Sequence, residues 1–127
     1  MRLSRACEVA LRAVPLLPEA GSAERGPGLA ELVDATGLPR PFLAKVLKEL
    51  VRRGLLRSRR GRAGGYALGR PAAEITLADV VLAVERKESL EKAFPAAGGE
   101  IGRALDPLRR RFFALLDERT IADLASK

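Results

Sequence analysis

The sequence predicts a mainly α-helical fold that contains one small β-hairpin. Three observations lead to this fold class. Two short amphipathic segments share residues 28–54, a glycine-rich stretch with apolar edges spans 55–68, and apolar side chains recur every three to four positions after residue 100. With 127 residues, the chain is long enough for one domain with a modest core and an accessory element.

A first helix is expected over about residues 3–17, because apolar side chains recur there on one face. Pro15 falls inside this pattern and should kink the helix or end it early. The segment 18–27 that follows is polar and rich in glycine and proline. We therefore expect it to form an irregular and mobile connection.

The next two helices are predicted to form a tight pair. Gly37 stands where the first of them needs a left-handed residue to end. Pro39 and Pro41 fall in the opening turn of the second, where a missing N–H costs little, and Gly54 ends it. Its basic residues lie off its apolar face. Such a pair is a helix-turn-helix, although the signal is weak alone, since any helical bundle contains a helix pair.

The segment from Leu55 to Leu68 predicts a β-hairpin with a strongly basic tip, because its glycines allow the positive φ angles of a turn. No acidic residue lies between Val51 and Ala73. So much unpaired positive charge favours an anionic partner, and a nucleic-acid phosphate backbone is the obvious candidate. The alternative interpretation is a basic loop that is only solvated and binds no partner. A basic hairpin directly after a helix-turn-helix indicates a winged helix-turn-helix.

The last third of the chain is predicted to be a long helix with an apolar seam. Its seam residues are spaced 4-3-4-3, the step of a coiled coil, and they are Ile101, Leu105, Leu108, Phe112 and Leu115. Asp106-Pro107 interrupts the seam, either as a helix start or as a kink. Thr76 with Asp79, and Thr120 with Asp123, have the spacing of capping boxes at two helix starts. The seam can pack back on its own domain, but we favour a dimer helix, since two-fold DNA sites need two reading heads.

Composition excludes several classes of protein. No apolar run approaches the roughly 18 residues that span a bilayer, and no signal peptide is evident, so we expect no membrane partner. The single cysteine cannot form an intramolecular disulfide and indicates a cytoplasmic protein. The net charge of +7 suits a polyanion, although it suits any basic protein as well. The lack of asparagine and glutamine fits a thermophile, yet GC-rich coding has a similar effect.

No catalytic arrangement is present in the sequence. The chain has no histidine to act as an imidazole base, and its serines have no evident activating partner. The glycine-rich stretch is not a phosphate-binding loop, because no Gly-Lys-Ser/Thr follows it. We therefore expect no catalytic residues and no enzyme.

Five segments resemble the Rrf family of winged-helix transcription regulators, in order and over nearly the whole chain: MRLSRACEVALRA, LPRPFLAKVLKELVRRGLL, RSRRGRAGGYALGRP, ITLADVVLAVE and TIADL. The resemblance implies a DNA-binding regulator, expected to be a repressor, that binds a double-stranded operator as a homodimer. It implies a DNA-binding domain at 1–86, a linker at 87–99, and a dimerisation helix with a short C-terminal helix at 100–127. A helix at about 39–53 would enter the major groove, and the wing would reach the minor groove.

The resemblance also indicates which residues contact DNA. On the recognition helix they are Arg40, Pro41, Ala44, Lys45 and Lys48. On the wing they are Arg57, Arg59, Arg60, Arg62, Gly64, Gly65 and Tyr66. At the first helix, phosphate contacts are expected from Arg2, Ser4 and Arg5.

One departure from the family concerns its cofactor. Many members hold an iron–sulfur cluster with three cysteines in the linker, but residues 88–104 of this chain contain neither cysteine nor histidine. Glu8 stands near the place of an acidic ligand in some relatives, and Ala44 replaces a glutamate found in others. We expect no cofactor and no metal. The effector is expected to be a protein or a small molecule, which the sequence does not identify.

Two other classes and one thiol stay open at this stage. An RNA-binding winged helix would more often display aromatic stacking residues, and a protein-interaction winged helix would not need the arginine wing. Cys7 lies in the apolar stripe of the first helix, so we expect a buried hydrophobe rather than a redox sensor.

Overall fold

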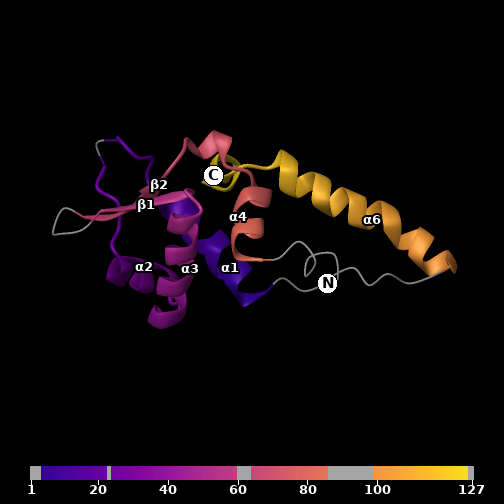
Figure 1. Cartoon of the computed structure of the whole chain (residues 1–127), viewed down its shortest axis with the longest axis horizontal. Coiled ribbons are helices and arrows are strands. Elements are labelled where there is room, and N and C mark those ends of the chain that lie inside the picture. The colour runs from indigo at the N-terminus through magenta and orange to yellow at the C-terminus, as the bar shows by residue number, and fades with distance from the viewer. Residues whose placement is uncertain (1–3, 23, 60–63, 86–98, 126–127) are drawn as a thin grey trace.

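The computed structural model describes residues 4–22, 24–59, 64–85 and 99–125. The elements, in chain order, are α1 (Arg5–Ala13), the 3-10 turn η1 (Val14–Leu16), α2 (Leu29–Thr36), α3 (Arg40–Arg52), β1 (Leu56–Arg59), β2 (Gly65–Leu68), the 3-10 turn η2 (Ala72–Glu74), α4 (Leu77–Val84), α6 (Gly99–Glu118) and α7 (Ile121–Ala125). The hairpin projects from one end of the helical body and α6 from the other (Figure 1). The predicted fold class is confirmed.

Helix α1 is shorter than the predicted 3–17. It begins after Ser4, whose Oγ accepts a hydrogen bond from the backbone N–H of Cys7 at 3.1 Å. Pro15 has no N–H to continue the helical ladder, so the chain tightens into the 3-10 turn η1. The expected early end is thus confirmed, and the helical pattern beyond it was misleading.

The helix pair is built as predicted. Gly37 ends α2 with a φ of 69°, and its N–H donates to the carbonyl oxygen of Val33 at 2.8 Å. Pro39 immediately precedes α3 and Pro41 lies in its first turn. The apolar face of α3 is buried in the core through Leu43, Val46, Leu47 and Leu50.

The connection between α1 and α2 is attached to the wing. Leu68 of β2 donates to the carbonyl oxygen of Pro18 at 2.8 Å, and Tyr66 donates to that of Pro27 at 2.9 Å. Gly26 and Gly65 approach so closely that a Cβ on Gly65 would lie 2.0 Å from the Gly26 carbonyl oxygen. The connection that we expected to be mobile is therefore fastened to β2 at both of its ends.

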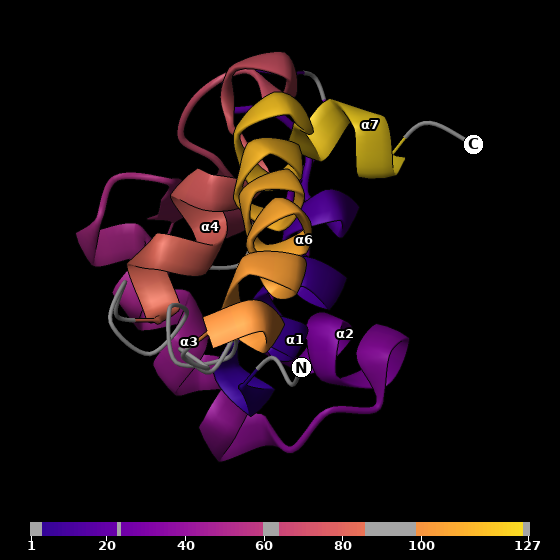
Figure 2. The ribbon, with the colours of Figure 1, turned by 90° about the vertical axis from the view of Figure 1, so that its right-hand side faces the viewer.

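Two clusters of apolar side chains hold the elements together. The larger joins α1, α3 and the base of the hairpin with Ile75, Val80 and Ile121. The smaller lies between α1, α4 and α6, where Cys7 meets Leu116. Figure 2 shows α6 in front of α4 and α1, with α7 turned to one side.

The C-terminal elements return to the helical body. Helix α6 continues through Pro107 without a new start. Of the two roles predicted for Asp106-Pro107, the helix start is therefore wrong. The backbone N–H of Ile121 then donates to Ile75 at 2.8 Å. Both predicted capping boxes are present, at α4 and at α7. Within the described ranges, no helix combines the length and apolar character needed to cross a bilayer.

Candidate nucleic-acid interface

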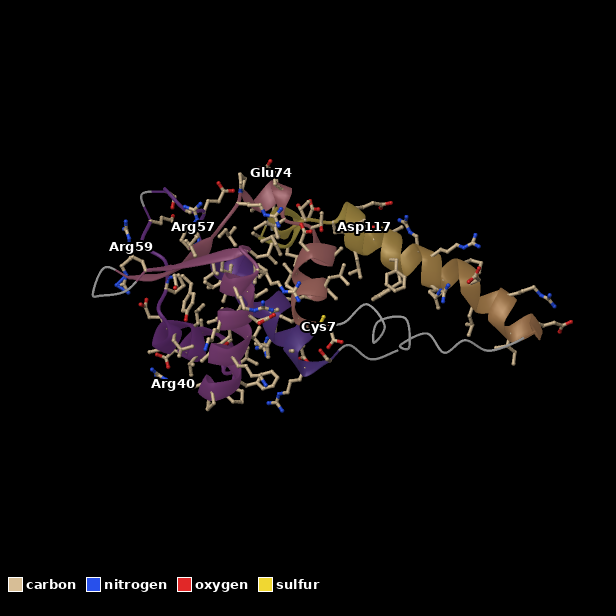
Figure 3. The ribbon with its side chains drawn as sticks, viewed as in Figure 1. Cys7, Arg40, Arg57, Arg59, Glu74 and Asp117 are labelled. Atoms are coloured by element: carbon tan, nitrogen blue, oxygen red, sulfur yellow. The ribbon has the colours of Figure 1, made fainter. Side chains whose placement is uncertain are left out.

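The exposed side of α3 carries a basic ridge, defined here as Lys45, Lys48 and Arg52. Steps of three and four residues put these side chains on one side of the helix, and all three are exposed. Arg40 lies at the start of the same helix (Figure 3). Of the remaining residues that we predicted on this helix, Pro41 is exposed and Ala44 is half-buried.

The wing adds two exposed arginines. Arg57 and Arg59 alternate with Ser58 along β1, so their side chains leave the same face of the hairpin. Figure 3 shows both on the hairpin, at the end of the molecule opposite α6. Arg60 and Arg62 lie outside the described residues. The described part of the wing thus presents positive charge at the same end of the molecule as α3.

The other predicted wing residues that the structure describes, Gly64, Gly65 and Tyr66, pack against neighbouring parts of the chain. Gly64 is buried, and Gly65 faces the Gly26 carbonyl group. Tyr66 is half-buried and packs against the larger core. It is paired with Ser58, on the face of the hairpin opposite Arg57. A glycine at position 65 and an aromatic ring at position 66 are thus explained by local packing.

The start of α1 lies beside the helix-turn-helix. The guanidinium of Arg5 stands 5.7 Å from the centre of the Phe42 ring, a cation–π contact between α1 and α3. Arg12 donates to the carbonyl oxygen of Thr36 at 2.7 Å, which joins α1 to the end of α2. Ser4 and Arg5 line an open groove of about 600 Å³ next to the turn. Arg2 lies outside the described residues.

Sequence reasoning missed the charged cluster at the end of α3. The Glu49 carboxylate accepts from Arg52 twice, with Nε donating to Oε2 at 3.0 Å and Nη2 to Oε1 at 2.5 Å. Arg53 Nε also donates to Oε1, at 3.4 Å. Hydrogen bonding to Arg52 is the main reason that the pKa of Glu49 falls to about 2. The i, i+3 and i, i+4 spacing of these residues was the available signal.

The seam predicted for a dimer is unevenly covered. Ile101 is 66% exposed, Leu105 38% and Leu108 58%, whereas Phe112 and Leu115 are half-buried. Phe112 packs against the smaller core. The half of the seam nearest the start of α6 is therefore an apolar surface in the single chain.

Cys7 is fully buried in the smaller core, with no exposed surface. Burial, with the negative charge of Glu85 as a second cause, raises the pKa of its thiol from 9.0 to about 11. A thiol in this state is neutral at physiological pH and poorly reactive.

Comparisons with known proteins agree with this geometry. The chain matches the Rrf2 family, described as "Iron-dependent Transcriptional regulator", over residues 3–127. It is 37% identical over 134 residues to Protein aau3 of Rhizobium meliloti (strain 1021), with 98% of this chain and 84% of the relative covered. It is 35% identical to a candidate HTH-type transcriptional regulator of Mycobacterium tuberculosis (strain CDC 1551 / Oshkosh), over 98% of this chain and 81% of the relative. The crystal structure of Staphylococcus aureus CymR has a TM-score of 0.78 at 26% identity, with 98% of each chain covered.

The fold defines a winged helix-turn-helix transcriptional regulator. The match over nearly all of its length shows that this chain belongs to the Rrf2 family. The resemblance stated from the sequence is thereby confirmed. The family consists of regulators and not of enzymes, so the expectation of no enzyme is confirmed as well.

The family description raises the question of an iron centre. Iron–sulfur clusters are held by several cysteine thiolates, and this chain has one cysteine and no histidine. That cysteine is buried as a neutral thiol. Among the residues that the structure describes, no three His, Cys, Asp or Glu side chains gather as metal ligands do. The residues present therefore do not fit an iron–sulfur cluster.

Proposed function

We propose that this protein binds a specific double-stranded DNA operator as a homodimer in the cytoplasm, and that it represses transcription without an iron–sulfur cluster. One observation carries the proposal: the two elements that a winged helix-turn-helix uses to read DNA both present unpaired positive charge. Lys45 and Lys48 on α3, and Arg57 and Arg59 on the wing, form no ion pair within the described residues. Phosphates would neutralise these cations and release bound counterions.

Each element has a distinct role in this proposal. The major groove is about 12 Å wide and accommodates a helix such as α3, so Arg40 and Lys48 reach base edges there. Ala44 offers a small apolar surface that suits a thymine methyl group. The wing arginines enter the adjacent minor groove, and Ser4 and Arg5 contact phosphates. A protein that occupies both grooves excludes other proteins from the operator, which supports repression.

The homodimer rests on the exposed part of the seam. Ile101 and Leu108 are large aliphatic side chains, more than half exposed on a helix that projects from the body (Figure 1). A second copy of α6 would bury both through a coiled-coil-like contact. Two-fold symmetry would then place two copies of α3 on successive half-sites.

The proposal that no cluster takes part rests on the donor set described above. Sensing would instead depend on an effector, a partner protein or a small molecule. The cluster-free protein should therefore bind DNA after treatment with a metal chelator.

Fluorescence anisotropy with labelled duplex DNA and with a structured RNA tests the proposal. We expect tight binding to duplex DNA that weakens steeply between about 50 and 200 mM salt. Arg59→Ala should weaken every sequence alike and reduce the salt slope by about one unit per lost contact in each protomer. Equal affinity for RNA, or an Arg59→Ala variant with unchanged affinity at every salt concentration, contradicts the proposal.

A further inference from the structure

Glu49 is an acidic residue on the helix that presents the basic ridge. Its carboxylate holds Arg52 through the two hydrogen bonds described above and touches Arg53 more loosely. Arg52 and Arg53 extend to different places: Arg53 lines an open groove of about 390 Å³ between α3 and α4, together with Glu49 and Lys45, and Arg52 does not. The side chain of Arg52 is 66% exposed, beside Lys48 on the ridge.

A carboxylate near a polyanion has an electrostatic cost, because it repels the phosphates that the ridge attracts. The geometry offers a compensation. Two hydrogen bonds through Nε and Nη2 fix the plane of the Arg52 guanidinium, and they leave the Nη1 hydrogens and the second Nη2 hydrogen free. A long side chain that is already ordered loses less conformational entropy when it binds.

We propose that Glu49 is a positioning residue for DNA binding, which holds the Arg52 guanidinium in line with Lys45 and Lys48 so that Arg52 donates its free N–H groups to a DNA phosphate. The inference rests on the proposed function and adds two residues to the DNA-binding surface. The depressed pKa of Glu49 keeps the carboxylate charged throughout the physiological pH range.

Positioning by Glu49 and simple electrostatics predict opposite effects of one substitution on the affinity for DNA. Glu49→Gln removes a negative charge from the DNA-facing helix, so charge alone predicts tighter binding. The loss of positioning predicts weaker binding instead. Because solvent screens an exposed pair of this kind, we expect the loss of affinity to be small, about two- to fivefold.

The test uses the full chain and a labelled random-sequence duplex long enough for both half-sites of a dimer. Anisotropy titrations between about 50 and 200 mM salt compare wild type with Glu49→Gln, Arg52→Ala and the double variant. Arg53→Ala is the matched control. It removes the same charge as Arg52→Ala, and Arg53 contacts the same carboxylate from the groove side. Thermal unfolding by circular dichroism verifies that each variant is folded at the temperature of the titrations.

We expect Glu49→Gln to bind two- to fivefold more weakly, and Arg52→Ala to reduce the salt slope by about one unit for each protomer. In the Arg52→Ala background, Glu49→Gln should cause no further loss, and Arg53→Ala should leave the slope nearly unchanged. If Glu49→Gln binds as tightly as wild type or more tightly, or weakens binding equally without Arg52, the positioning role is wrong. If wild type itself fails to bind the duplex, the proposed function fails instead.

Discussion

Replacing Gly65 with alanine should separate the wing from the connection that precedes α2. An added Cβ would lie 2.0 Å from the Gly26 carbonyl oxygen and 3.0 Å from that of Pro27. A relaxed carbon–oxygen contact is about 3.3 Å, so the two backbones must move apart by roughly 1.3 Å. Both contacts are with backbone atoms, which cannot swing away as the end of a flexible side chain does.

The cost of this separation can be estimated from its parts. Overpacking of this kind costs about 1–3 kcal/mol. The hydrogen bond from Tyr66 N–H to Pro27, 2.9 Å long, would also be stretched or lost, at about 0.5–1.5 kcal/mol. Together they lower the free energy of unfolding by roughly 2–4 kcal/mol, or about 8–16 °C in Tm for a chain of this size.

Gly28→Ala is the matched control, because the same methyl group there lies 3.8 Å from Glu31 Oε1 and the backbone is extended, with a φ of −82°. It should cost about 1 kcal/mol or less. Thermal and urea unfolding followed by circular dichroism measures both variants. If Gly65→Ala melts within about 2 °C of Gly28→Ala, the close approach of wing and connection is wrong.

Four further predictions concern the seam, the thiol and the donor set. Leu108→Glu should convert the dimer to a monomer in size-exclusion chromatography with light scattering, whereas Leu124→Glu, at an exposed position of α7, should leave it dimeric. If the Leu108→Glu variant is dimeric as well, the seam is not part of the interface. Cys7→Ser should cost about 1 kcal/mol or more and should leave DNA binding insensitive to peroxide, as in wild type; release of wild type alone by peroxide would make the thiol a switch. The folded thiol keeps its proton to a higher pH than the unfolded one, so wild-type stability should fall between pH 9 and 11 more steeply than that of Cys7→Ser, and parallel curves would contradict the burial. Protein purified anaerobically with iron and sulfide should stay colourless, and a stoichiometric iron–sulfur absorbance would overturn the donor-set argument.

Local chemistry made much of the fold predictable from the sequence. Gly37 has only a short-range role, which is to end α2 in the left-handed region. Thr76 and Asp79 cap α4 through bonds three residues apart. Signals of this kind depend on neighbours along the chain, so the pattern alone identifies them.

The features that the sequence did not reveal depend on distant contacts. The connection at 18–27 is held by backbone hydrogen bonds to β2, and backbone groups leave no side-chain pattern. Gly26 and Gly65 mark the approach, but a glycine in a turn-rich segment has many explanations. Ile121 packs into the larger core from a short C-terminal helix, and this contact also joins residues that are far apart in the chain.

The candidate site was partly predictable in the same sense. The basic ridge was visible as helical spacing on α3, although Arg52 was not predicted to contact DNA. Its pairing with Glu49 uses a spacing that occurs on many solvated helices, where exposed pairs contribute little. Only the direction of each side chain distinguishes Arg52, on the ridge, from Arg53, in the groove.

Selection of bound fragments from the protein's own genome, followed by footprinting of an enriched fragment, determines whether the protein reads a specific operator as a dimer. We expect one enriched sequence with two-fold symmetry. Its two protected half-sites should be separated by about one helical turn, or a multiple of it, with contacts in both grooves. No enriched sequence, or a single protected half-site without symmetry, would show that the protein does not bind a specific operator as a dimer.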